Sequence, residues 1–128
     1  MKAYTDLQQS EKLAKILPIE SADMFCADVC IKEKHSYNFY ILSNWGYNTF
    51  EEMKEHENNY VHFMPCWSLS ALVNVLPRID IEKEIWSSDK YDYRVKAFIG
   101  DGYVGDWYDN PVDACVEMIV KLKETNQL

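Results

Sequence analysis

The sequence has no run of lysine or arginine, and its 13 basic residues are outnumbered by 21 aspartates and glutamates. The resulting net charge of −8 repels phosphate backbones and anionic lipid head groups. Direct binding to nucleic acid or to a membrane surface is therefore not expected. An acidic surface keeps a protein soluble. It can also bind basic partners or mimic nucleic acid.

A long hydrophobic run is also missing. No stretch approaches the roughly 20 apolar residues that a membrane-spanning helix needs. Residues 1–20 contain no apolar core of the length typical of a signal peptide. We therefore expect a cytoplasmic protein. Thiols are kept reduced in that compartment, so the four cysteines are expected to be free.

Linkers, low-complexity segments and internal repeats are absent as well. The 128 residues are close to the commonest size of one domain, and the 48% hydrophobic and 27% charged residues are typical of globular proteins. We therefore expect a single α+β domain over residues 1–128. Aromatic residues are plentiful at 14%, which indicates either an aromatic-rich core or an aromatic binding surface.

Hydrophobic spacing predicts the element order α-β-β-α-α-β-β-β-α. The predicted helices cover residues 5–17, about 50–57, 66–76 and the segment that starts at Pro111. The predicted strands cover residues 23–31, 37–42, 79–85, 91–99 and 103–108. Strands and helices do not alternate regularly, so we expect a largely antiparallel sheet of about five strands packed with helices. Residues 58–64 are interpreted as an extended connection.

Capping residues predict where three helices begin. Thr5 with Gln8 and Thr49 with Glu52 both match the capping box, in which the two side chains satisfy free backbone N–H groups. Asn110 precedes a proline and is the predicted N-cap of the last helix. In the sheet, residues 37–42 are apolar on both faces, which favours a central strand.

Asp101 and Gly102 form the strongest short hairpin signal in the chain. A two-residue loop would pair Ile99 with Val104. The same register places Asp106 on the apolar face, which is unfavourable. A longer loop, a bulge that shifts the register, or a position of Asp106 at the rim would each remove the conflict.

Two segments carry a resemblance to known proteins. These are "PCWSLSALVNVLP" and "YDNPVDACVEMIVKL", together with "ESADM" at 20–24. They resemble a group of small proteins without an assigned activity, encoded by gut Bacteroides-type bacteria, their phages and their mobile elements. The resemblance covers about a third of the chain and excludes residues 32–63. It implies a bacterial or phage accessory protein and supplies no functional residues.

Cys66 is the weak candidate for a catalytic nucleophile, with His62 as its base. Nucleophilic catalysis needs a base within hydrogen-bond reach and a third group that orients the base. A cysteine at a helix N-terminus is more readily ionised, and the predicted position of Cys66 therefore favours it as a nucleophile. However, no nucleophile motif surrounds it, and a small buried cysteine beside Trp67 explains the position without chemistry. We therefore expect no catalytic residue.

The cysteines and histidines do not form a metal-binding pattern. Cys26 and Cys30 have a spacing that zinc sites allow, but a strand would hold them about 13 Å apart at about 3.3 Å per residue. The aspartates around Asp101 lack the spacing of a calcium loop. We therefore expect no metal and no cofactor.

Three tryptophans lie outside the predicted core stripes, namely Trp45, Trp86 and Trp107. Exposed aromatic rings supply a large contact area at low entropic cost, so we interpret these three as candidate binding residues. The alternative is that another helix covers the face that bears them.

The leading functional hypothesis is a non-enzymatic protein-interaction module with an unknown protein partner. One alternative is a small thiol-dependent hydrolase centred on Cys66. Another is an acidic inhibitor of a nucleic-acid enzyme. A self-complementary aromatic patch would produce a homodimer.

Overall fold

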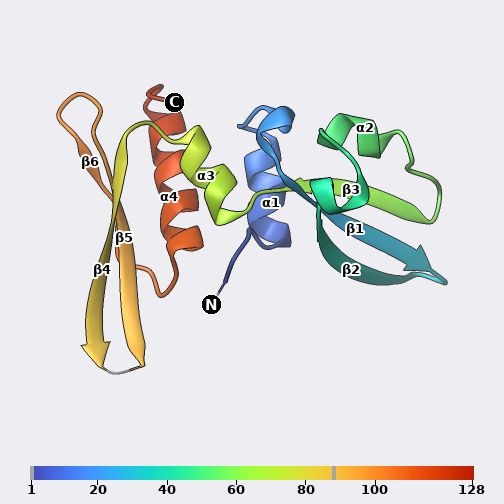
Figure 1. The fold of residues 1–128 in the computed structure, drawn as a ribbon, viewed down its shortest axis with the longest axis horizontal. Coiled ribbons are helices and arrows are strands. Elements are labelled where there is room, and N and C mark those ends of the chain that lie inside the picture. Colours follow the sequence, from blue (N-terminus) through green and yellow to red (C-terminus); the bar gives the residue numbers. More distant parts are fainter. Residues whose placement is uncertain (1, 88) are drawn as a thin grey trace. The chain divides into compact units, whose positions relative to one another are not determined.

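A computed structural model describes residues 2–87 and 89–128 (Figure 1). These residues contain four α-helices and two antiparallel sheets of three strands each. The α+β class is therefore confirmed, whereas the expected sheet of about five strands is wrong. The described chain divides into two compact units, residues 6–68 and residues 2–5 with 69–128. Each unit holds one of the sheets, and a single domain over 1–128 stays a prediction.

The sheet of residues 6–68 has the order β2-β1-β3, and its three strands are antiparallel. The strands are β1 (Met24–Ile31), β2 (Lys34–Ile41) and β3 (Val61–Cys66). Two predictions are corrected here. The stretch interpreted as a connection is largely strand β3, and β2 is an edge strand although its sequence suggests a central one. The central strand is β1, whose first four residues are buried on both faces.

A two-residue turn joins β1 to β2. Lys32 and Glu33 both adopt the left-handed conformation, with φ of 51° and 65°. This conformation matches the right-handed twist of the two strands and fixes their register. The register places Cys30 opposite His35 on one face of the sheet.

Helix α1 (Leu7–Ala14) packs beside β3, and Leu7 contacts the buried cluster of Met24, Cys26 and Cys66. The helix is shorter than the predicted 5–17, and its N-cap lies one residue later than predicted. Its N-cap is Asp6, and Gln9 completes the capping box in place of the predicted pair of Thr5 and Gln8. The observed and the predicted capping boxes have the same i, i+3 spacing and differ by a shift of one residue.

The other face of this sheet is covered by short helices. These are η1 (Ile19–Ser21), η2 (Leu42–Trp45) and α2 (Phe50–Lys54). The prediction for α2 is confirmed at its start, because the Thr49 hydroxyl accepts a hydrogen bond from the Glu52 backbone N–H. Leu42, Phe50 and Met53 pack into a buried cluster against the strand residues Phe25 and Ala27.

The second unit has the sheet order β4-β5-β6, with α4 packed against the central strand β5 and against α3. Its elements are α3 (Leu69–Val75), β4 (Ile79–Ser87), β5 (Lys90–Ala97), β6 (Tyr103–Val104) and α4 (Pro111–Glu124). The start of α4 is confirmed, because the Asn110 side chain accepts a hydrogen bond from the Asp113 backbone N–H at 2.8 Å. All five residues of its predicted core stripe are buried, namely Val112, Cys115, Val116, Ile119 and Leu122.

The loop between β5 and β6 is longer than two residues. Ala97 pairs with Tyr103, so residues 98–102 form the loop and the predicted pairing of Ile99 with Val104 is wrong. Of the alternatives considered, the longer loop is the one observed. Asp106 is exposed, and its backbone N–H donates to the Glu117 carboxylate at 3.1 Å. The unfavourable burial that a two-residue loop would cause is thereby avoided.

Within the described residues, no helix combines the length and the apolar character that a bilayer span requires.

Candidate functional site

A cavity of about 310 Å³ opens on the sheet face of residues 6–68 that bears η2 and α2. Six of its eight lining residues have aromatic rings, counting histidine. The lining residues are Phe25, Ala27, Tyr40, Trp45, Tyr47, Met53, His56 and Phe63. We call this cavity the aromatic pocket. It lies at the lower end of the volume range typical of ligand sites.

The wall of the aromatic pocket depends on how η2 ends. Leu42 is 2% exposed and anchors η2 in the core. Gly46 then adopts a left-handed conformation with φ of 80°, and its N–H donates to the Ser43 carbonyl at 3.2 Å. An added Cβ at Gly46 would meet no atom within 4 Å, so glycine is favoured here by backbone conformation and not by lack of space. This turn places Trp45 and Tyr47 on either side of the glycine.

The rings of the pocket contact one another mostly at an angle. The Tyr40 and Trp45 ring centroids are 5.3 Å apart with an interplanar angle of 73°, and the Phe25 and Phe63 centroids are 5.7 Å apart at 86°. Tilted contacts of this kind are favourable because the positive edge of one ring meets the negative face of another.

The floor and the rim of the pocket differ in exposure. Phe25 and Met53 at the floor are 5% and 2% exposed, whereas Trp45 at the rim is 59% exposed. Among the residues that the structure describes, no aspartate, glutamate, lysine or arginine lines the pocket. The surrounding unit is acidic, because residues 6–68 contain ten aspartates and glutamates and five lysines. The first turn of α2 contributes Glu51 and Glu52.

The three candidate tryptophans are divided between the two units. Trp45 belongs to residues 6–68, whereas Trp86 and Trp107 belong to the other unit. Trp86 is 59% exposed and its Nε1 donates to the Asp92 carboxylate at 2.6 Å. Trp107 is 37% exposed, with the Arg94 guanidinium 4.6 Å from the ring centroid. The alternative that a helix covers these rings is therefore wrong, while their role in binding stays a prediction.

Cys66 is enclosed in the core. Its side chain is 0% exposed, and its Sγ lies 3.3 Å from the Ser10 hydroxyl, which donates to it. Burial raises the pKa of the Cys66 thiol to about 12. His62 is exposed and lies four residues earlier on the same strand, about 13 Å away at about 3.3 Å per residue. These two residues do not form a nucleophile with its base.

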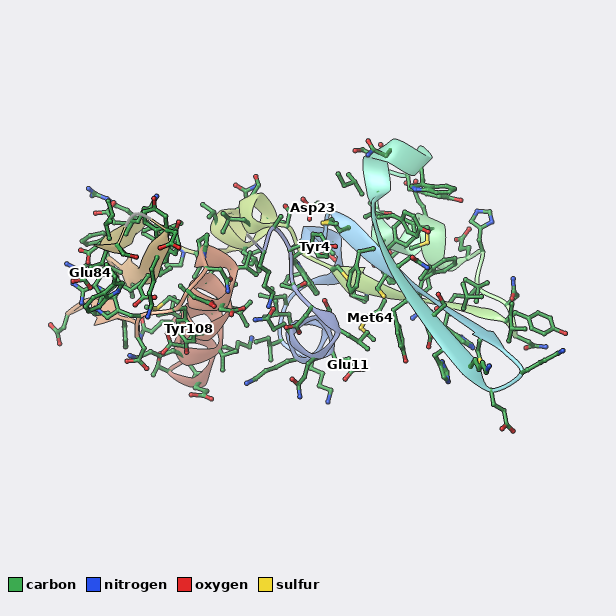
Figure 2. All side chains as sticks on the ribbon, turned by 90° about the horizontal axis from the view of Figure 1, so that it is seen from below. Tyr4, Glu11, Asp23, Met64, Glu84 and Tyr108 are labelled. Atoms are coloured by element: carbon green, nitrogen blue, oxygen red, sulfur yellow. The ribbon has the colours of Figure 1, made fainter. Side chains whose placement is uncertain are left out.

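The segment around Cys66 is held by other polar contacts. Asp23, labelled in Figure 2, lies directly before β1, and its carboxylate accepts hydrogen bonds from both the backbone N–H and the hydroxyl of Ser68. The Trp67 ring is buried, and its Nε1 donates to the Ser21 hydroxyl at 2.9 Å. Cys66, Trp67 and Ser68 are therefore structural residues.

The sequence reasoning missed a cluster on the face that bears α1. Cys30 Sγ lies 3.9 Å from His35 Nε2, and His35 Nδ1 lies 2.9 Å from the Asp28 carboxylate. The signal for it was present, because a two-residue turn at Lys32 and Glu33 places Cys30 and His35 opposite each other. The predicted strands 23–31 and 37–42 leave residues 32–36 as a longer connection, and this concealed it.

Within residues 2–87 and 89–128, no three histidine, cysteine, aspartate or glutamate side chains have an arrangement that could hold a metal ion. Cys26 is also buried, and desolvation together with the charge of Asp28 raises its pKa to about 11.

The chain was compared with family models, with curated proteins and with solved structures, and none of them matches it.

Proposed function

We propose that the protein is a non-enzymatic interaction module that binds a basic protein partner through the aromatic pocket. The observation that carries this proposal is the open, ring-lined cavity with Trp45 at its rim. The resemblance to accessory proteins of Bacteroides-type bacteria and their phages adds a cellular setting. The proposal places the protein in the cytoplasm, where its four free cysteines would stay reduced.

The chemistry of the pocket favours a cationic side chain as the occupant. The faces of aromatic rings are electron-rich and attract ammonium and guanidinium groups, with an energy of about 0.5–2 kcal/mol. The rings of Trp45, Tyr40 and Tyr47 supply such surfaces. The acidic unit around them adds a long-range attraction for lysine or arginine on a partner.

The size of the pocket favours one side chain over a larger ligand. A cavity of about 310 Å³ holds a single long side chain and little else. A lysine buries its apolar stem against Phe25, Phe63 and Met53 while its charged end stays near the open rim. The partner is therefore a protein with an exposed basic segment, and the inserted residue is its anchor.

The test is a titration of the full chain with two peptides that differ at one position. One peptide carries lysine at its centre, and the other carries norleucine, which has a similar stem and no charge. We expect the lysine peptide to bind at least about fivefold more tightly, because its ammonium adds about 1 kcal/mol from the ring faces. Chemical shift changes in residues that line the pocket would locate the peptide.

Trp45→Ala is the matching variant, and Trp86→Phe is its control. We expect Trp45→Ala to weaken the lysine peptide by about tenfold and Trp86→Phe to leave its affinity unchanged. Equal binding of both peptides would contradict a cationic occupant, and no binding of either would contradict the pocket as a binding site. Capture of a protein from the native host supports the proposal only if the Trp45→Ala variant no longer captures that protein.

No observation favours the two alternative functions to a similar degree. A hydrolase centred on Cys66 needs an accessible thiol, and this thiol is fully buried. Iodoacetamide labelling of Cys66 in the folded protein would revive that hypothesis. An inhibitor that mimics nucleic acid needs free carboxylates on one face. Two carboxylates are instead paired with cations, Glu82 with Arg94 and Lys96 and Asp113 with Lys2.

A further inference from the structure

In the sheet of residues 6–68, a thiol, an imidazole and a carboxylate lie next to one another near the turn between β1 and β2. The Cys30 Sγ lies 3.9 Å from His35 Nε2. The other ring nitrogen, His35 Nδ1, lies 2.9 Å from the Asp28 carboxylate. The three residues are accessible, with Cys30 half-buried and the side chains of His35 and Asp28 49% and 27% exposed. By contrast, Met24 and Cys26 on the same face are buried.

The order of the three groups determines what each can do. An ionised carboxylate only accepts hydrogen bonds, so the ring nitrogen that faces Asp28 carries the proton. The lone pair of His35 Nε2 then points at the sulfur and can accept the thiol proton. A nucleophile, a base within reach and a group that orients the base are the parts that covalent catalysis requires.

Other contacts hold the cluster in place. The Tyr37 ring stacks on the His35 imidazole with a centroid distance of 6.0 Å and an interplanar angle of 9°. The Cys30 backbone N–H donates to the Tyr60 carbonyl at 2.8 Å, and the two-residue turn fixes the register of the strands. The arrangement is thus set by the sheet and not by one mobile side chain.

We propose that Cys30 is a nucleophilic thiol that exchanges with low-molecular-weight disulfides, with His35 as its base and Asp28 as the positioning residue. The thiol proton passes to His35 Nε2 while Sγ attacks one sulfur of the disulfide. The sulfur–sulfur bond of the reagent breaks, and the departing thiolate takes the proton from the imidazolium. The products are a mixed disulfide on Cys30 and one free thiol, so the oxidation of Cys30 is balanced by the reduction of the departing sulfur.

This site is separate from the aromatic pocket. Cys30 and Asp28 point to one face of β1, whereas the pocket residues Phe25 and Ala27 alternate with them and point to the other. The proposal therefore does not depend on what the pocket binds.

The remaining cysteines serve as internal controls. Cys26, Cys66 and Cys115 are all buried, and burial raises the pKa of their thiols to about 11, 12 and 12. They should stay unmodified for as long as the chain is folded.

The experiment exposes the folded full chain to glutathione disulfide at pH 7 and maps the adducts by mass spectrometry of its peptides. We expect an adduct on Cys30 and none on the other three cysteines until urea unfolds the chain. We expect His35→Gln to lower the rate at Cys30 about tenfold, because an unassisted thiol is only a few per cent ionised at pH 7. His62→Gln replaces the residue opposite Asp28 on β3 and should lower the rate less than His35→Gln does.

Two variants at Asp28 separate positioning from folding. Asp28→Asn should lower the rate about threefold or more, and Asp28→Glu should restore part of it, because the longer carboxylate still accepts from the ring. In urea all variants should react at the same rate. An adduct that forms first on a buried cysteine, or a Cys30 rate that His35→Gln leaves unchanged, would overturn the proposal. Equal rates for Asp28→Asn and the wild type would remove the role assigned to Asp28.

Discussion

The two units of the chain each have a three-stranded antiparallel sheet, but they use their exposed aromatic residues in different ways. In residues 6–68, the rings of Tyr40 and Trp45 meet at an angle around a cavity. In the other unit, Trp86 bonds to Asp92 and Trp107 lies against Arg94. Rings that are already paired with charged neighbours offer little to a ligand. Trp45 lines a cavity, whereas Trp86 and Trp107 are paired with charged side chains. Exposure alone therefore does not single out a candidate binding residue.

The largest expected effects come from the residues that anchor each unit. We expect Phe50→Ala and Ile119→Ala to lower the free energy of unfolding by about 3–5 and 2–5 kcal/mol, because each empties a fully buried position. Amide hydrogen exchange measured along the chain would show which segments lose protection. Loss confined to the mutated unit would show that the two units unfold separately, and equal loss in both would show one cooperative domain.

The buried thiols predict a dependence on alkaline pH in both units. Burial raises the folded-state pKa of Cys66 and Cys115 from 9.0 to about 12, so their stabilising effect is complete below pH 9. It is lost as the pH rises from 9 toward 12, because only the unfolded chain releases these protons readily. We expect a loss on the order of 1 kcal/mol per thiol between pH 9 and pH 10. Urea unfolding at several pH values would measure it, and Cys115→Ala should flatten the slope.

The helix caps should have effects of about 1 kcal/mol. Asn110 caps the fourteen residues of α4, and Thr49 caps the five residues of α2 beside the aromatic pocket. We expect Asn110→Ala to lower the thermal midpoint of the whole second unit. We expect Thr49→Ala to increase amide exchange mainly around α2, since a short helix depends on its neighbours for stability. A larger global effect of Thr49→Ala would contradict this difference.

The smallest effect should follow from Glu82 on the outer face of the second sheet. Hydrogen bonds from Lys96 and Arg94 lower the pKa of its carboxyl group below the usual 4.5. Its contribution is therefore complete above the unfolded pKa and is lost as the pH falls through the lower folded pKa. Because these three side chains are about one-third exposed, Glu82→Gln should have a small effect at pH 7 and should slightly reduce the sensitivity to acid. An NMR titration of Glu82 would show the lowered pKa directly.

The sequence predicted best those features that are encoded by neighbouring residues. The start of α4 at Asn110 and the start of α2 at Thr49 follow from a few adjacent side chains. Strand β3 was missed because Pro65 and the polar His62 interrupt its pattern, and only its pairing with β1 gives it order. The division into two sheets was missed because strand patterns do not show which strands share a sheet; most of the observed pairs join consecutive strands, and the sheet boundary falls between β3 and β4.

The candidate sites likewise differ in how local their residues are in the sequence. Trp45 was singled out from composition, but the aromatic pocket needs Tyr40, Phe63 and His56 from three further segments, and no spacing in the sequence relates them. The cluster of Cys30 and His35 is more local. It depends on the turn between β1 and β2, and an error of a few residues in that turn was enough to conceal it.

The second unit is assembled from two stretches that lie far apart in the sequence. Residues 2–5 join residues 69–128, and the Ala3 carbonyl accepts a hydrogen bond from the Leu69 backbone N–H at 3.2 Å. The Lys2 ammonium pairs with Asp113 at 2.8 Å. During synthesis, residues 6–68 leave the ribosome before Leu69 and Asp113, which bond to Ala3 and Lys2. The order of translation therefore favours early folding of the sheet with the aromatic pocket and late closure of the other.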